Sequence, residues 1–190
     1  MVITGIAGCR YLTSECANTV YSFELPIKAY PDSKSINLGD TIWFEINSST
    51  QFKDESTGNF IDYDKAENLG TSMSFAGILK DSIFPITVDK FNFILKKGNE
   101  GTSSDIKLRK QFRFPDIGNR YEFVLGLVAK EKGTFSILFS RAATVYRSDD
   151  KCTKAAFAIN FADTDQHYEL HPHFVNNTGF KGGDYYFVVE

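Results

Sequence analysis

Apolar side chains recur at every second position along much of the chain. Near the start, Tyr21, Phe23, Leu25 and Ile27 alternate with Ser22 and other intervening residues. Successive side chains of a β-strand point to opposite faces, so this period predicts strands with one buried face. The same period predicts further strands over residues 41–47, 72–79, 88–95, 106–114, 121–129, 134–139, 157–161 and 185–189.

Three details of this pattern refine the expected strands. Pro26 cannot donate a backbone hydrogen bond, which favours an edge position for the first strand. The turn Lys130-Glu131-Lys132-Gly133 separates two predicted strands and indicates a hairpin, with glycine where a positive φ is needed. The clearest alternation is in residues 106–114. It predicts a core face of Ile106, Leu108, Phe112 and Phe114. The opposite, basic face towards solvent consists of Lys107, Arg109, Gln111 and Arg113.

Helical periodicity is confined to residues 63–69, where Gly70 ends a stretch of one or two turns. Roughly ten short strands with little helix predict an all-β protein, an antiparallel β-sandwich of immunoglobulin-like or related type. We expect residues 1–190 to form a single domain. The alternative is two small β domains divided in the polar, glycine- and serine-rich segment near 98–105.

Composition narrows the function classes. The chain is 42% hydrophobic and 24% charged, with a net charge of -3 at pH 7. It therefore lacks the basic excess typical of nucleic-acid binding, and no apolar run is long enough to span a bilayer. The sequence also lacks the G-x-S-x-G and G-x-x-x-x-G-K-[ST] motifs of nucleophilic and phosphate-binding enzymes. We expect a non-catalytic protein without a cofactor.

Cys9, Cys16 and Cys152 are the candidates for a disulfide. Either Cys9 pairs with Cys16, or one of them pairs with Cys152. Cys16 and Cys152 each precede a predicted strand, so neighbouring strand starts would bring them together. A disulfide favours an exported protein over a cytosolic one with three reduced thiols. Residues 1–8 do not form a signal peptide, so an exported protein would have lost its leader.

A metal site is the main chemical hypothesis near the C-terminus. If residues 167–173 are extended, His167, Glu169, His171 and His173 project from one face. Imidazole and carboxylate groups of this kind are ligands for a divalent metal such as zinc. Side chains in such a row are about 7 Å apart, so only some of the four could bind one ion. The alternative is a polar loop with exposed histidines.

A second hypothesis concerns exposed aromatic rings, because the apolar face of a sugar stacks on such rings. Trp43 lies on the polar face of its predicted strand, and Tyr63 and Tyr168 fall outside the regular strand pattern. These three residues are the candidates for ligand binding. The alternative is that the rings pack beneath loops or in the core.

The order of several short motifs resembles a group of bacterial proteins. A cysteine-bearing start precedes Val20-Tyr21-Ser22-Phe23 and Leu38-Gly39-Asp40-Thr41-Ile42-Trp43-Phe44. Later come Lys132-Gly133-Thr134-Phe135, Cys152 and the ending Asp184-Tyr185-Tyr186-Phe187-Val188-Val189. The chain resembles uncharacterised envelope-associated β-sandwich proteins of bacteria, which are exported and often lipid-anchored at an N-terminal cysteine.

The resemblance implies an exported all-β protein of the cell envelope or extracellular space, without known catalysis. It leaves open a lipid anchor in the full-length precursor. We therefore expect a cell-surface or periplasmic protein that binds a partner protein or a glycan. The alternatives are a small metal-binding protein built on the histidine cluster, and a structural subunit that pairs through an exposed edge strand.

Overall fold

The computed structural model describes residues 19–173 and 182–190. These residues form sixteen β-strands and two 3₁₀ helices, η1 (Val88–Lys90) and η2 (Tyr168–Leu170), and contain no α-helix. The all-β class is therefore confirmed, while the expected number of about ten strands is too low. The difference comes from short strands of two to four residues, which give too few alternations to be seen in the sequence. Within the described residues, no helix is long and apolar enough to cross a membrane.

The first sheet has seven strands. Its order is β6 (Ala66–Glu67), β14 (Ala142–Arg147), β15 (Thr153–Phe161), β1 (Thr19–Tyr30), β3 (Thr41–Ser49), β12 (Arg120–Ala129) and β9 (Phe91–Lys97).

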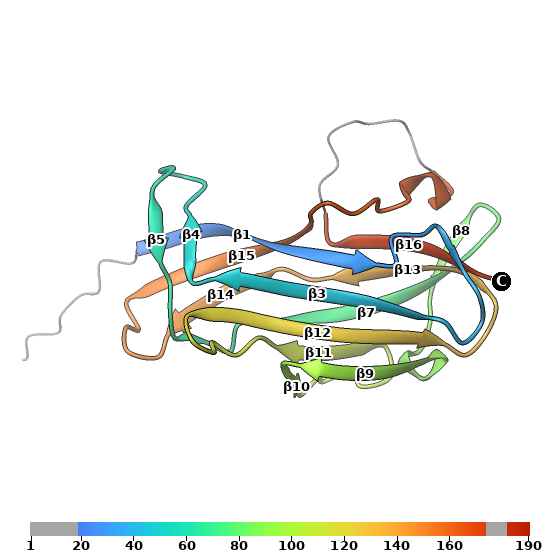
Figure 1. The fold of residues 1–190 in the computed structure, drawn as a ribbon, viewed down its shortest axis with the longest axis horizontal. Helices are drawn as coiled ribbons and strands as arrows, with labels where there is room; N and C mark the ends of the chain where they lie inside the picture. Colours follow the sequence, from blue (N-terminus) through green and yellow to red (C-terminus); the bar gives the residue numbers. More distant parts are fainter. Residues whose placement is uncertain (1–18, 174–181) are drawn as a thin grey trace, which may run out of the picture.

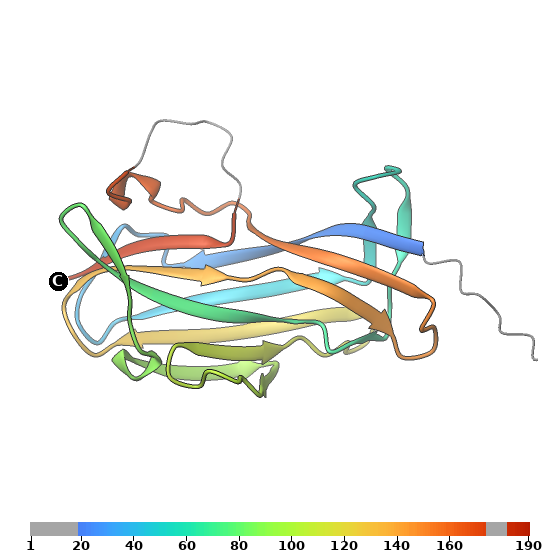
Figure 2. The same ribbon diagram turned by 180° about the vertical axis from the view of Figure 1, so that it is seen from behind.

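The second sheet stacks on the first. Its order is β10 (Asn99–Gly101), β11 (Arg109–Arg113), β7 (Gly70–Leu79), β13 (Gly133–Phe139), β16 (Asp184–Val189) and β2 (Ser35–Ile36), and β8 (Ser82–Pro85) also pairs with β7. A separate hairpin consists of β4 (Gln51–Lys53) and β5 (Phe60–Asp62). Figure 1 shows the first sheet in front, and Figure 2, in which the molecule is seen from behind, shows the second sheet in front.

The hydrophobic core lies between the two sheets and follows the predicted alternation. In β1 every second residue from Phe23 to Ala29 is buried, and β3 shows the same pattern. In β12 the inward residues are buried as well, within an unbroken buried run over 123–127. Aromatic rings join the layers: the ring centroids of Phe44 in β3 and Phe139 in β13 are 5.1 Å apart, and those of Phe112 and Phe123 are 5.4 Å apart. The faces predicted to be apolar therefore form the contact between the sheets.

Two pairings depart from a purely antiparallel sandwich. β1 runs parallel to β15 from Thr19 to Ile27, and β16 runs parallel to β2. The expected edge position for β1 is wrong, since β1 lies between β15 and β3. The pairing with β3 begins only at Lys28. Pro26 therefore precedes that ladder and is paired on one side, which is why a proline is tolerated in a central strand.

The strand predicted over 106–114 is shorter than expected. β11 begins at Arg109, and the side chains of Ile106 and Leu108 are exposed instead of facing the core. The Asp105 carboxylate accepts a hydrogen bond from the Leu108 N–H, and its carbonyl accepts one from the Arg109 N–H. These local bonds favour a turn over an extended strand. Only the part of the pattern around Phe112 belongs to a strand.

The turn at residues 130–133 is not a hairpin turn. β12 belongs to the first sheet and β13 to the second, so this connection crosses from one layer to the other. The Lys130 N–H donates to the carbonyl of Lys90, 3.0 Å away. Gly133 has a φ of 154°, as the glycine at this position predicted. Each sheet pairs a strand that precedes residues 98–105 in the sequence with one that follows them. These pairs are β3 with β12 in the first sheet and β7 with β11 in the second.

Candidate functional site

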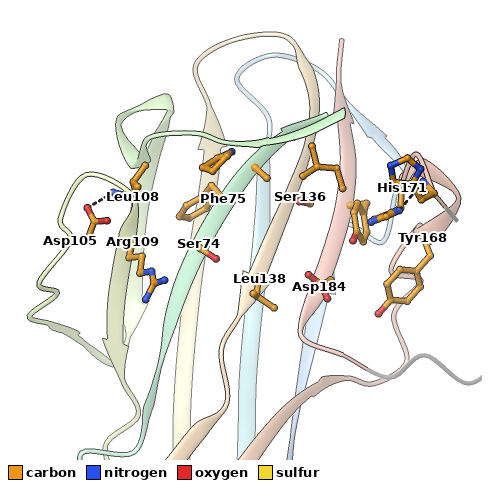
Figure 3. A pocket seen from close by; sticks show the side chains of 15 residues that line it. Ser74, Phe75, Asp105, Leu108, Arg109, Ser136, Leu138, Tyr168, His171 and Asp184 are labelled. Atoms are coloured by element: carbon orange, nitrogen blue, oxygen red, sulfur yellow. Dashed lines mark hydrogen bonds between the residues drawn. The ribbon is translucent and has the colours of Figure 1, made fainter. Parts of the chain in front are cut away.

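A pocket of about 720 Å³ lies on the outer face of the second sheet. Its floor is formed by side chains of the three central strands β7, β13 and β16 (Figure 3). These floor residues include Ser74, Ala76, Ser136, Leu138, Asp184 and Tyr186. Because inward positions of the same strands fill the core, these outward positions are available to form a second surface.

One wall of the pocket comes from β8 and from the turn that precedes β11. Ile83 and Pro85 lie on β8, which pairs with β7. Asp105 and Leu108 belong to the turn described above and Arg109 is the first residue of β11, and Figure 3 shows all three at one side of the pocket. The interruption of the predicted strand at 106–108 therefore contributes directly to the pocket.

The opposite wall is the segment that follows β15. It carries Tyr168, His171 and His173 into the pocket lining. The segment is tied to the end of β1, where the Ala29 N–H donates to Thr164 Oγ1 at 3.1 Å. It is also tied to β16, because the Tyr186 N–H donates to the carbonyl of Gln166 at 3.1 Å.

Aromatic and imidazole rings form one corner of the pocket. The ring centroids of Tyr168 and Tyr186 are 5.6 Å apart, and those of His171 and Tyr186 are 5.8 Å apart at an interplanar angle of 80°. The His173 N–H donates to His171 Nδ1 at 3.1 Å. In the neutral ring of His171, Nε2 therefore carries the proton and can donate to a ligand.

Burial changes the titration of the groups in this corner. Desolvation raises the pKa of the Asp184 carboxyl above its usual value, and the nearby His171 opposes this shift. Desolvation also raises the pKa of Tyr168 to about 12 and raises the pKa of Tyr186. Both phenols are therefore neutral at physiological pH, and Asp184 is the carboxylate for which burial is costly.

Three aliphatic side chains are partly exposed in the rest of the pocket. Ile83, Leu108 and Leu138 retain 41%, 38% and 40% of their accessible surface, respectively. All three line the same hollow. Single exposed aliphatic residues are common, but several that share one concave surface indicate a binding site.

The predicted metal ligands are divided between two places. Residues 167–173 are not extended, because His167 has left-handed backbone angles (φ 53°, ψ 44°) and η2 follows it. His171 and His173 line the pocket. His167 is buried and lies near Glu169 and near Asp165, which sequence reasoning did not select. A left-handed residue breaks the period of two, so the four side chains do not share one face.

The aromatic candidates also lie in different environments. Tyr168 is part of the pocket, whereas Trp43 is half-buried on the outer face of the first sheet. Lys96 Nζ lies 3.7 Å from the centroid of the Trp43 ring. An exposed ring at Tyr63 is wrong: this side chain is fully buried, and its hydroxyl donates to the carbonyl of Val145 at 2.8 Å. Its satisfied hydroxyl explains why a tyrosine is tolerated in the core.

Of the three cysteines predicted to take part in a disulfide, only Cys152 lies within the described residues. Cys152 is disulfide-bonded. Cys9 and Cys16 lie outside the described residues, so the pairing stays a prediction.

Outer strands offer little surface for pairing with another chain. β6, β10 and β2 are two or three residues long, whereas β9 has seven residues. β9 ends in Lys96 and Lys97, and the Lys97 ammonium forms an ion pair with Glu122 at 2.7 Å. Short outer strands and lysine side chains are features that oppose strand addition.

The sequence contains a signal for the pocket that the alternation analysis missed. Leu138 stands between Ile137 and Phe139, and Tyr186 stands between Tyr185 and Phe187. In each run three apolar residues are consecutive, so one of them must lie on the face opposite the core. Those two outward residues, Leu138 and Tyr186, are both in the pocket lining.

Comparisons with known proteins give no family. No protein-family model matches the chain, and no curated protein matches it. Among solved structures, a type II cohesin domain from the cellulosome of Acetivibrio cellulolyticus is similar over 72% of this chain and 91% of its own, with 10% identity and a TM-score of 0.31. A non-cellulosomal cohesin from the hyperthermophilic archaeon Archaeoglobus fulgidus is similar over 80% of this chain and 99% of its own, with 10% identity and a TM-score of 0.27. Scores of this size support no inference about function.

Proposed function

We propose that this β-sandwich, of immunoglobulin-like or related type, is a non-catalytic module that binds a segment of a partner protein in the pocket on its second sheet. The observation that carries the proposal is the exposure of Ile83, Leu108 and Leu138 in one hollow of about 720 Å³. Burying these side chains under an apolar anchor of a partner removes their surface from water, which favours association.

The apolar surface favours a protein segment over a glycan. A sugar ring needs an open aromatic face to stack on and polar groups around it. Tyr186 retains only 6% of its accessible surface, so its ring is not an open platform. The aliphatic side of the pocket suits a leucine, isoleucine or aromatic anchor of a peptide better than it suits hydroxyl groups.

Polar groups at the other side of the pocket supply selectivity. Asp184 is a carboxylate whose charged form is disfavoured by burial, and a lysine or arginine side chain of the partner would offset that cost. Ser136 and His171 offer further hydrogen-bonding groups in the pocket lining, and Ser74 offers one across Leu138 from Asp184. We therefore expect the partner segment to combine one apolar anchor with a neighbouring basic residue.

We also propose that the protein acts outside the cytoplasm, as an exported envelope-associated or extracellular protein. The disulfide at Cys152 supports this location, because such bonds persist in oxidising compartments. Mass spectrometry of the protein from its native source, with thiols alkylated before and after reduction, tests it. A fully reduced Cys152 would contradict the proposal.

A random peptide library displayed on phage tests the partner-binding proposal. Peptides selected on the wild-type protein should share an aliphatic or aromatic anchor and a basic residue. Their affinity for Leu138→Glu should fall about tenfold or more, because a charge replaces an anchor contact at the centre of the pocket. Isothermal titration calorimetry measures the difference, and circular dichroism confirms that the variant is folded.

Ile117→Glu is the matched control. Ile117 retains 58% of its accessible surface and does not line the pocket, so this change should leave peptide affinity unaltered. Equal losses for the two variants, or no peptide enrichment over the Leu138→Glu protein, would contradict the proposal. Binding on a glycan array that Leu138→Glu abolishes would assign the pocket to a carbohydrate instead.

A further inference from the structure

His167 is a buried residue whose ring nitrogens face carboxylates on two sides. The residue retains 6% of its accessible surface, and its Nε2 has no hydrogen-bond partner among residues 19–173 and 182–190. Buried polar groups in native proteins are almost always hydrogen-bonded. An unpartnered imidazole nitrogen among acidic groups therefore needs an explanation.

The spacing around His167 Nδ1 is too wide for hydrogen bonds. Nδ1 lies 3.6 Å from Asp165 Oδ2 and 3.9 Å from Glu169 Oε1. Hydrogen bonds between nitrogen and oxygen are about 2.7–3.2 Å long. The ligand atoms offered by Asp165, His167 and Glu169 all lie within 4.8 Å of one another. An ion bound at about 2.0–2.2 Å from each atom spans ligand separations of up to about 4.4 Å, so the two distances from Nδ1 fit directly and the widest separation in the group must close by up to about 0.4 Å.

We propose that Asp165, His167 and Glu169 form a binding site for a divalent transition metal of the zinc class. His167 Nδ1 and one oxygen from each carboxylate are the three protein ligands, and water completes the coordination. One imidazole and two carboxylates favour zinc over calcium or magnesium, which prefer sites made of oxygen alone.

Backbone geometry brings these three ligands together. In a regular strand, residues 165, 167 and 169 would lie in a row about 7 Å apart. The left-handed conformation of His167 and the start of η2 at Tyr168 bend the chain at the middle ligand. The His167 N–H also donates to Asp165 Oδ1 at 2.9 Å, which holds that carboxylate against the bend.

Asp32 lies on the other side of the imidazole as a positioning residue. Its Oδ1 is 3.7 Å from His167 Nε2. Both of its oxygens accept the Asp165 N–H, at 3.2 and 3.1 Å. A histidine that binds a metal through one nitrogen commonly donates its other N–H to a carboxylate, which orients the ring. Asp32 is the carboxylate nearest to Nε2, and the ring and this carboxylate must close by about 0.5 Å to form that bond.

Lys34 is the competitor at this site. Its Nζ lies 3.1 Å from Glu169 Oε1, the same oxygen that faces His167 Nδ1. A metal must share or displace this ammonium group. Removal of the lysine should therefore strengthen metal binding, whereas a site held together only by ion pairs would be weakened by the same change.

Calorimetric titration of the chelator-treated full chain with zinc chloride tests the proposal, together with elemental analysis of the loaded protein. We expect one zinc per chain. Asp165→Asn and Glu169→Gln should each weaken binding about 10- to 100-fold, and Asp32→Asn should also weaken it by about tenfold. Asp165 and Glu169 are exposed, so these variants should fold. Lys34→Ala should bind zinc more tightly than the wild type.

Asp163→Asn and His173→Ala are the matched controls. Asp163 is an exposed carboxylate paired with Lys28, and His173 lines the pocket, so neither change should alter zinc affinity. Zinc binding lost in His173→Ala but kept in Glu169→Gln would overturn the proposal and place the metal at the pocket. No binding at millimolar zinc, or weaker binding in Lys34→Ala, would also overturn it. Peptide binding lost in Leu138→Glu is a separate outcome, because that variant leaves all three ligands intact.

Discussion

The outer faces of the two sheets differ in how their apolar side chains are covered. On the first sheet, the Trp43 ring lies against Gly126 and beneath the ammonium group of Lys96. On the second sheet, Leu138 and Ile83 remain about two-fifths exposed in a pocket. On the first face side chains of the same sheet cover the Trp43 ring, and Ile94, which is 42% exposed in the same row, does not line the pocket. The second face has a hollow that a partner can fill.

This difference shows why an aromatic residue on a polar face is a weak sign of binding. The alternation of its strand predicts that Trp43 lies outward, and it does lie outward. A glycine on the neighbouring strand and a lysine on the next one supply its packing. The more informative feature is a group of aliphatic residues around one hollow, which only the folded chain reveals.

The largest effect is expected in the core beneath both faces. Phe157 is fully buried, and its ring centroid lies 5.2 Å from that of Phe23 and 5.1 Å from that of Phe52. Phe157→Ala should lower the free energy of unfolding by about 3–5 kcal/mol, because it removes packing and leaves a cavity. Urea denaturation followed by circular dichroism measures the change.

Phe60→Ala provides the comparison for this variant. Phe60 retains 74% of its accessible surface on β5, so the change should alter stability by no more than about 0.5 kcal/mol. If Phe60→Ala were as costly as Phe157→Ala, the core would extend beyond the space between the sheets.

A smaller effect is expected on the covered face. A Cβ atom at Gly126 would lie 2.8 Å from Trp43 Cζ3 and 3.0 Å from Thr41 Cγ2. Gly126→Ala should therefore cost about 1–3 kcal/mol of unfolding free energy, because the indole must move from its packed position. Thermal and urea unfolding of the variant measure this cost.

The double variant decides whether the indole is responsible. In a Trp43→Leu background the ring is absent, and alanine restricts the unfolded chain more than glycine does. Gly126→Ala should then be much less costly, or even stabilising. An unchanged cost in that background would mean that the backbone, and not the cover over Trp43, limits this position.

Local pattern was sufficient for the core and insufficient for the topology. Alternation in β1, β3, β12 and β13 identified the buried residues, because one buried face is a property of each strand alone. It could not show that β12 and β13 belong to different sheets, or that β1 lies parallel to β15. Those facts depend on partners far away in the sequence.

The candidate site was predicted only in part for the same reason. The histidine cluster predicts His171 and the aromatic-ring hypothesis predicts Tyr168, and both line the pocket. Leu138 and Asp184 come from different strands, which pair with each other at these two residues. The raised pKa of Asp184 depends on burial that neighbouring residues in the sequence do not reveal.

The smallest effect is expected at Asp184, on the open face. Burial raises the pKa of its carboxyl in the folded protein above the unfolded value of about 4. As the pH rises from about 4 to the raised pKa, the folded state keeps a proton that the unfolded chain has released, so the free energy of unfolding falls. Asp184→Asn should therefore raise the melting temperature slightly at pH 7 and leave it unchanged below pH of about 4. Asp163→Asn should do the reverse, because Lys28 lowers the pKa of Asp163 and its carboxylate favours folding at neutral pH. A lower melting temperature for Asp184→Asn at pH 7 would mean that the Asp184 carboxylate stabilises the fold. It would then not be a group whose burial cost a partner offsets.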